Sequence, residues 1–302
     1  MPPPQTSAAL AASLVVAGGT GNAADVAVVQ PEIAKLPADM LNFLIGKGAK
    51  VVACRESVTD VETSLRNVVP RGWEGLVPRR TWDSVPGTYL AKGKRVIVAT
   101  TSAPAGGRKV PDIGAGHGSA NLAVHETLHG RHRLAGKVLK SKSFKQARQA
   151  DFARLPDYLR QEGVAGLEET YAESGARFFQ GDPKLAADWP ALFAFWSGGP
   201  IPPAPPRASA VLASVSGAAR ERAAPRAGAI GAAEMADDGT ITLDLRAAKR
   251  GALGHALFVI RPDDPDYEEV RAQHFPGQGG ASILASLSGG SRSVLVRPIN
   301  GD

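Results

Sequence analysis

Residues 125–129 read His-Glu-Thr-Leu-His (HETLH), and residues 166–179 read GLEETYAESGARFF. On an α-helix, His125 and His129 lie one turn apart on one face, so both imidazoles can reach one metal ion. Glu126 is offset from that face and can take a proton from a water molecule at the metal. Ser119 suits the N-cap of a helix over residues 120–129. The pattern predicts a zinc site on this helix.

A hydrolytic zinc ion needs a third protein ligand beside an open coordination position. The metzincin pattern places a histidine six residues after the second one, but position 135 is Ala. Residues 166–179 predict a second helix, one face of which carries two glutamates and two small side chains: Glu169, Ala172, Glu173 and Ala176. Glu169 is the expected third ligand, and Glu173 the expected hydrogen-bond partner of a ligating histidine. Glu168 and His132 stay open as alternative ligands, and a surface helix with an acidic first turn is the alternative without a metal.

The HETLH motif followed by EETYAE forty residues later resembles the catalytic domain of the anthrax lethal factor-like metallopeptidases, a family that includes the Pro-Pro endopeptidases. The family motif on the second helix is Glu-aromatic-aromatic-Ala-Glu. Residues 169–173 match it, except that Thr170 replaces the first aromatic residue. The resemblance covers about residues 25–197.

This resemblance implies a zinc-dependent endopeptidase of the gluzincin type that hydrolyses a protein or peptide substrate. One Zn²⁺ per chain would be bound by His125, His129 and Glu169, and Glu126 would be the general base. The family also suggests a secreted or delivered effector or toxin. The alternative function is a non-catalytic binding protein on a zincin scaffold, although the intact Glu126 argues against it.

The family also has a tyrosine that hydrogen-bonds the oxyanion, about seven residues before the ligating glutamate. Here that position is Glu162, so the family pattern is not met. Tyr158, eleven residues before Glu169, is the expected catalytic tyrosine if the chain carries a loop insertion. Tyr171 is the second choice.

We expect an α+β fold in which a small mixed sheet carries the two helices. Residues 1–24 are expected to be flexible or to form a hairpin, and residues 25–197 to form the zincin-like catalytic domain. Within it, Arg95–Thr101 is predicted as a strand, either an edge strand that pairs with an extended substrate or an ordinary core strand. A Pro/Ala-rich linker over residues 198–234 would lead to a small β-rich module over residues 235–302. That module could bind a delivery, chaperone or immunity partner.

The net charge of +6 comes with a basic run over residues 131–148. Because Phe144 is its only aromatic residue, we expect a solvated surface and no nucleic-acid partner. No apolar stretch is long enough for a membrane span. The first basic residue is Lys35, so no classical signal peptide is expected. Delivery would then use a non-classical route, and a cytoplasmic location is not excluded.

The turn at residues 18–22 (GGTGN) resembles a dinucleotide-binding fingerprint, which requires a helix directly after the glycines. Residues 24–29 look β-like and are followed by Pro31, so we expect a hairpin turn instead and no nucleotide cofactor. A nucleotide-dependent enzyme is the third functional alternative. The single cysteine, Cys54, excludes a disulfide framework.

Overall fold

The computed structural model describes residues 5–202, 230–249, 251–276 and 292–296. Its strands are β1 (Val15–Ala17), β2 (Lys50–Arg55), β3 (Gly87–Leu90), β4 (Arg95–Ser102), β5 (Arg108–Lys109), β6 (Gly231–Met235), β7 (Ile241–Lys249), β8 (Ala252–Ile260) and β9 (Arg292–Val296). Its α-helices are α1 (Ser7–Leu14), α2 (Ala23–Ile33), α3 (Ala38–Gly46), α4 (Leu122–Ala135), α5 (Lys142–Asp151), α6 (Asp157–Arg160), α7 (Gly163–Gln180), α8 (Leu185–Asp188), α9 (Pro190–Ser197) and α10 (Tyr267–His274). The expected α+β fold is confirmed.

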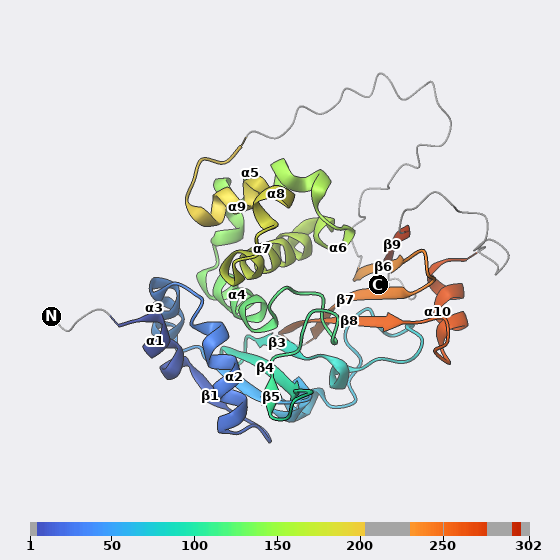
Figure 1. Cartoon of the computed structure of the whole chain (residues 1–302), viewed down its shortest axis with the longest axis horizontal. Helices are drawn as coiled ribbons and strands as arrows, with labels where there is room; N and C mark the ends of the chain where they lie inside the picture. Colours follow the sequence, from blue (N-terminus) through green and yellow to red (C-terminus); the bar gives the residue numbers. More distant parts are fainter. Residues whose placement is uncertain (1–4, 203–229, 250, 277–291, 297–302) are drawn as a thin grey trace.

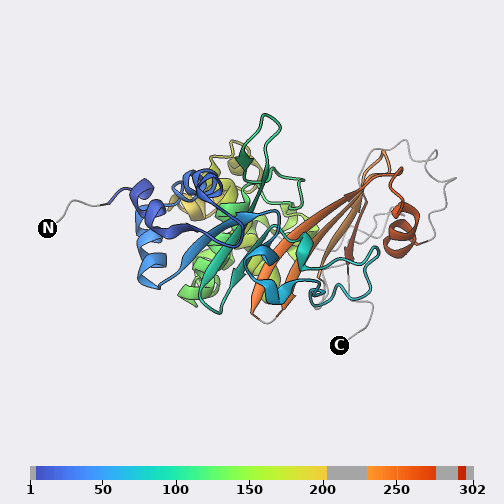
Figure 2. The same cartoon turned by 90° about the horizontal axis from the view of Figure 1, so that it is seen from below.

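The strands form one mixed sheet in the order β1-β2-β4-β3-β8-β7-β6-β9, with β5 paired to β4 (Figures 1 and 2). Strands β1, β2 and β4 run parallel, and every other pair is antiparallel. Helix α4 packs against β3 and β4, and α7 packs on α4 (Figure 1). The two helices that carry the predicted motifs therefore lie together on one face of the sheet.

Alternating side chains of the strands build a core on each face of the sheet. In β4, Val96 and Val98 join the core shared with α1–α4 and α7, whereas Ile97 and Ala99 join the opposite core. The second core is closed by Trp73 and by residues of the C-terminal strands. Among the described residues, no helix is both long and apolar enough to cross a bilayer.

The N-terminal residues differ from the expectation of a flexible segment or hairpin. Residues Ser7–Leu14 are helical, and α2 begins at Ala23, directly after the glycine turn. Asn22 caps this helix, and the Asp25 carboxylate accepts a hydrogen bond from the Asn22 amide at 2.8 Å. This capping box outweighs the β-branched residues that made the segment look like a strand.

The glycine turn is therefore followed by the helix that a dinucleotide fingerprint requires. In this turn, however, the donors that could bind a phosphate are already used. The Thr20 amide and hydroxyl both donate to Asp60 Oδ2 at 2.7 Å. A Cβ at Gly21 would lie 2.4 Å from the Ala53 carbonyl oxygen. The glycines thus permit close packing on β2, and the turn gives no support for a nucleotide site.

Of the two alternatives for Arg95–Thr101, the edge strand is wrong and the core strand is confirmed, because β4 lies between β2 and β3. Likewise, the C-terminal strands do not form a sheet of their own. Strand β8 pairs with β3 in the register Gly87↔His255 to Leu90↔Ala252, so the two parts share one sheet. Main-chain pairing of this kind leaves no mark on composition, which explains the error. Of the predicted linker, residues 203–229 lie outside the described residues.

The basic run after the HETLH motif is partly used inside the fold. Arg131 lies over the Phe43 ring at 4.6 Å, and Arg133 pairs with Glu168 at 2.7 Å. Arg148 donates to the Leu159 carbonyl oxygen at 2.7 Å. These three arginines therefore hold neighbouring elements together, whereas the four lysines of the run are exposed, as expected of a solvated surface: Lys137, Lys140, Lys142 and Lys145.

The buried carboxylate of Asp25 offers a test of the N-terminal packing. It accepts hydrogen bonds from Thr100 Oγ1 at 2.6 Å and Arg108 Nε at 3.0 Å. Asp25→Ala should lower the free energy of unfolding by about 3–5 kcal/mol at neutral pH, because it removes the buried partner of Arg108 and leaves that cation with only the exposed carboxylate of Glu56. Denaturant unfolding measures this, with Asp39→Ala, an exposed carboxylate in the first turn of α3, as the control.

The pH dependence of the same variant follows from the pKa of Asp25. Burial alone would raise this pKa, but hydrogen bonds, led by that from Thr100, hold it below its usual value. The stabilisation is therefore present above the unfolded pKa of about 4 and is lost as the pH falls through the folded pKa. The difference between wild type and Asp25→Ala should shrink in acid. A difference that stays constant across this range contradicts the assignment.

Candidate metal centre and active site

Helix α4 presents the HETLH motif toward α7 and the sheet. Its N-cap is Asn121, two residues after the predicted Ser119, and Asn121 Oδ1 accepts a hydrogen bond from the Val124 amide at 3.1 Å. Gly130 allows close contact with the sheet, since a Cβ there would lie 3.0 Å from the Val96 side chain. Both histidines of the motif are consequently buried between the helices and the sheet.

Helix α7 approaches α4 closely because small residues line the contact. A Cβ at Gly175 would lie 2.4 Å from Leu128 on α4. Ala172 and Ala176 are fully buried in the same contact region of the core. This close approach is what allows the short side chain of Glu169 to reach the histidines.

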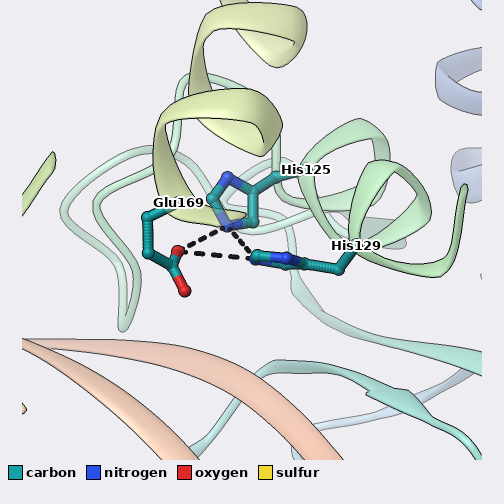
Figure 3. A group of neighbouring side chains, drawn as sticks. All are labelled: His125, His129 and Glu169. Carbon is teal, nitrogen blue, oxygen red and sulfur yellow. Dashed lines mark hydrogen bonds and ion pairs between the residues drawn. The ribbon is translucent and has the colours of Figure 1, made fainter. Parts of the chain in front are cut away.

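His125, His129 and Glu169 converge on one point between the two helices (Figure 3). The Nε2 atoms of the two histidines are 3.0 Å apart. Glu169 Oε2 lies 3.5 Å from His125 Nε2 and 3.4 Å from His129 Nε2. The ligand atoms all lie within 4.8 Å of one another, a spacing that one metal ion can bridge.

This donor set fits a zinc ion. Two imidazoles and one carboxylate are the ligands of many catalytic zinc sites, and both oxygens of Glu169 are buried without a hydrogen-bond partner. Burial alone would raise the pKa of Glu169, but the imidazoles of His129 and His125 hold it well below its usual range. The buried carboxylate is thus ionised and turned toward the two histidines, where a cation would satisfy it.

Neighbouring side chains fix the outer nitrogen of each histidine. Glu173 Oε2 lies 3.2 Å from His125 Nδ1, and its other oxygen accepts a hydrogen bond from the Ala120 amide at 3.0 Å. His132 Nε2 lies 3.2 Å from His129 Nδ1. Such contacts orient ligating imidazoles. His132 therefore stands behind His129, away from the point where the other three residues meet.

Glu168, the other alternative ligand, is engaged elsewhere. Arg246 donates to its Oε2 at 2.5 Å, and Arg133 lies 2.7 Å from its Oε1. Both oxygens of Glu168 are therefore occupied by arginines. The geometry therefore favours Glu169 over Glu168 as the third ligand.

Glu126 lies beside the three converging residues and is fully buried, with neither oxygen hydrogen-bonded. Burial, together with the negative charge of Glu169, raises its pKa to about 8 in the chain without a metal. Gly87 of β3 makes room for it, since a Cβ there would lie 2.7 Å from Glu126 Cγ. Its two unpartnered oxygens are therefore available to a water molecule or substrate at this point.

Tyr158 on α6 also faces this site. Its hydroxyl is buried without a hydrogen-bond partner, and burial, with Glu169 as the next cause, raises its pKa well above the usual value. Tyr171 instead packs in the core, with its ring 5.6 Å from that of Phe144 and 4.9 Å from that of Trp196. Of the two candidate tyrosines, Tyr158 is the one placed beside Glu169.

The C-terminal strands contribute three side chains that no motif indicated. Arg246 Nε on β7 lies 3.4 Å from Glu169 Oε1. The His255 ring on β8 lies 5.6 Å from the His125 ring and stacks on Tyr158 at 5.1 Å. His255 Nε2 also contacts Asp244. The only sequence signal for this group is the strand alternation that puts Asp244 and Arg246 on one face of β7.

Comparisons with known proteins relate this chain to peptidases. No family model matches the chain. A Pro-Pro endopeptidase of Paenibacillus alvei is 34% identical over 123 residues, which are 40% of this chain and 51% of that protein. The chain thus spans about half the length of this relative. A Pro-Pro endopeptidase of Clostridioides difficile is 30% identical over 171 residues, which are 54% of this chain and 70% of that protein.

A solved structure resembles the fold as well. The Pro-Pro endopeptidase PPEP-2 from Paenibacillus alvei matches with a TM-score of 0.51 and 28% sequence identity. The match covers 63% of this chain and 98% of that one. More than a third of the present chain therefore has no counterpart in that structure.

Metal content tests the assignment of the ligands. We expect one zinc per purified chain by elemental mass spectrometry, and loss of that zinc in Glu169→Gln. Glu173→Gln should weaken zinc binding by only about 10–100-fold, because it removes an orienting contact and no ligand. Glu168→Gln is the matched control and should keep its zinc. Full zinc content in Glu169→Gln would move the third ligand to another residue.

Proposed function

The chain belongs to the Pro-Pro endopeptidase family of zinc metallopeptidases, and from this premise we propose that it hydrolyses the bond between two adjacent prolines of a protein or peptide substrate. The observation that carries the proposal is the convergence of His125, His129 and Glu169, with the unpartnered carboxylate of Glu126 beside them. The name that both relatives carry, Pro-Pro endopeptidase, supports a substrate with two adjacent prolines.

In the proposed mechanism, His125, His129 and Glu169 hold the zinc ion. When bound, zinc lowers the pKa of a water molecule and polarises the scissile carbonyl group. Glu126 accepts a proton from the water molecule as the water oxygen bonds to the carbonyl carbon. Glu126 then gives this proton to the leaving nitrogen as the carbon–nitrogen bond breaks.

Two further residues support this reaction. Tyr158 stays protonated because its pKa is raised, so its hydroxyl can donate a hydrogen bond to the oxyanion that forms on the carbonyl. The buried hydroxyl has no competing hydrogen-bond partner. Glu173 positions the His125 ring through Nδ1. Each role follows from a contact or an unused polar atom of this chain.

We also propose that the enzyme is a secreted or delivered effector that acts on a protein outside the cell that makes it. This part rests on the resemblance to the lethal factor-like enzymes. A delivery, chaperone or immunity partner that binds the C-terminal strands belongs to the same proposal. Comparison of new protein N-termini after exposure of target cells to wild type and to Glu126→Gln tests it. Cleavage after proline in secreted or surface proteins, absent with Glu126→Gln, is the expected result.

Substitution of the general base tests the enzymatic function. Glu126→Gln should bind zinc as wild type does, yet lose at least about 10³-fold in kcat/KM, because no group remains to take the proton. The assay uses a quenched peptide with a central Pro-Pro pair, and mass spectrometry locates the cut. A matched peptide with Ala-Ala is the control. Equal cleavage by wild type and Glu126→Gln would show that this site does not catalyse the reaction.

Tyr158→Phe tests the oxyanion contact separately. The variant keeps the ring and loses only the hydroxyl, so its stacking on His255 should persist. We expect kcat to fall by about 10²–10³-fold with little change in KM, because the contact forms only in the transition state. Tyr171→Phe is the matched control and should keep kcat. An unchanged kcat in Tyr158→Phe would remove this residue from the mechanism.

A further inference from the structure

The position beside strand β3, next to the proposed active site, is occupied by another strand of this chain. Strand β3 lies directly beside Glu126, and extended peptides commonly bind proteins by pairing with such a strand. Here β8 takes that place, antiparallel to β3, with His255 opposite Gly87 and Ala252 opposite Leu90. The Thr88 hydroxyl adds a hydrogen bond to the Leu253 carbonyl oxygen at 2.9 Å.

The side chains of β7 and β8 that face α4 also fill the active site. His255, in register with Gly87, lies against the rings of both His125 and Tyr158. Arg246, in register with His255, reaches the carboxylate of Glu169. The hairpin thus contacts a proposed zinc ligand on each helix and the proposed oxyanion tyrosine.

A second contact holds β8 over the site from the other side. The Leu257 amide donates to the Gly116 carbonyl oxygen at 2.9 Å, in the loop that leads into α4. In the same loop, a Cβ at Gly118 would lie 3.3 Å from His255 Cε1. Strand β8 is therefore held by its two neighbours β3 and β7 and, in addition, by the loop before the catalytic helix.

As a result, the catalytic residues are closed off from solvent. His125, Glu126, His129 and Glu169 are at most 1% exposed, and Tyr158 is 4% exposed. A neighbouring cavity of about 310 Å³ is lined by basic side chains, namely Arg71, Arg133, Arg246 and Lys249, and by none of the five catalytic residues. An endopeptidase must place a polypeptide backbone against these residues, whereas their side chains here have almost no surface exposed to one.

We propose that the β7–β8 hairpin is an autoinhibitory segment, in which β8 takes the place of the substrate strand and keeps the enzyme latent. The inference rests on the proposed peptidase function. Activity then requires β8 to leave β3, which withdraws His255 and Arg246 and opens the site. The occupant is part of this chain, so the covalently linked hairpin competes with substrate at a high effective concentration.

A cross-strand disulfide tests the latency in the full-length, zinc-loaded chain. Leu90 and Ala252 are register partners, so Leu90→Cys combined with Ala252→Cys can lock β8 onto β3. The natural Cys54 is buried, and burial raises its pKa to about 12, so it should not interfere. Oxidation should lower cleavage of the Pro-Pro peptide by about tenfold or more, and a reductant should reverse the loss.

The opposite variant loosens the hairpin. A Cβ at residue 254 would lie 2.4 Å from the Gly87 carbonyl oxygen, so Gly254→Val should weaken the β3–β8 pairing. We expect kcat/KM to rise by about tenfold or more. Val259→Thr is the control, because Val259 lies on the same strand and is 37% exposed. Arg246→Ala should also raise the rate, whereas a fall in kcat at constant KM would make Arg246 part of the catalytic machinery instead.

The outcomes separate the two proposals. Equal rates for the oxidised and reduced disulfide variant overturn the latency and leave the peptidase function intact. The Gly254→Val variant gives a second check. If circular dichroism shows that it is folded and it holds zinc, a rate no higher than that of wild type also overturns the latency. If neither wild type nor any of these variants cleaves the peptide, the proposed peptidase function is overturned, and the proposed latency with it.

Discussion

The close packing of α7 on α4 is the constraint on which the site depends. Glutamate has a short side chain, so Glu169 reaches the two histidines of α4 only if the helices nearly touch. Gly175 and the buried alanines of α7 provide that contact, and Gly130 seats α4 on the sheet. Larger side chains here would separate the ligands before any chemistry could begin.

Around this contact, most buried polar groups form hydrogen bonds or ion pairs, but a few of their atoms have no hydrogen-bond partner. Glu168 is taken by two arginines, and the outer nitrogens of both histidines are held by neighbours. The oxygens of Glu126 and Glu169 and the Tyr158 hydroxyl remain without hydrogen-bond partners. Because a buried unpaired polar atom is costly, this pattern supports the proposed positions of the metal ion and the substrate.

The C-terminal strands change how this centre is used. They join the sheet at β3 and bring Arg246 and His255 into the same buried cluster as the catalytic residues. A peptidase whose substrate edge is filled by its own chain gains control over when it cuts. The pairing of β8 with β3 also brings the C-terminal strands into the core that contains Trp73. The same contacts therefore serve both stability and the proposed regulation.

The amino-acid sequence by itself determined the candidate zinc ligands, because helical spacing places His125 and His129 on one face and the alanines beside Glu169 allow close approach. It did not reveal the capped helix α2, since the Asn22–Asp25 cap outweighs the β-branched residues around it. Only the tertiary structure decided which tyrosine faces the site and what pairs with β3. Backbone hydrogen bonds between distant strands are open to almost any sequence, so residue patterns do not report them.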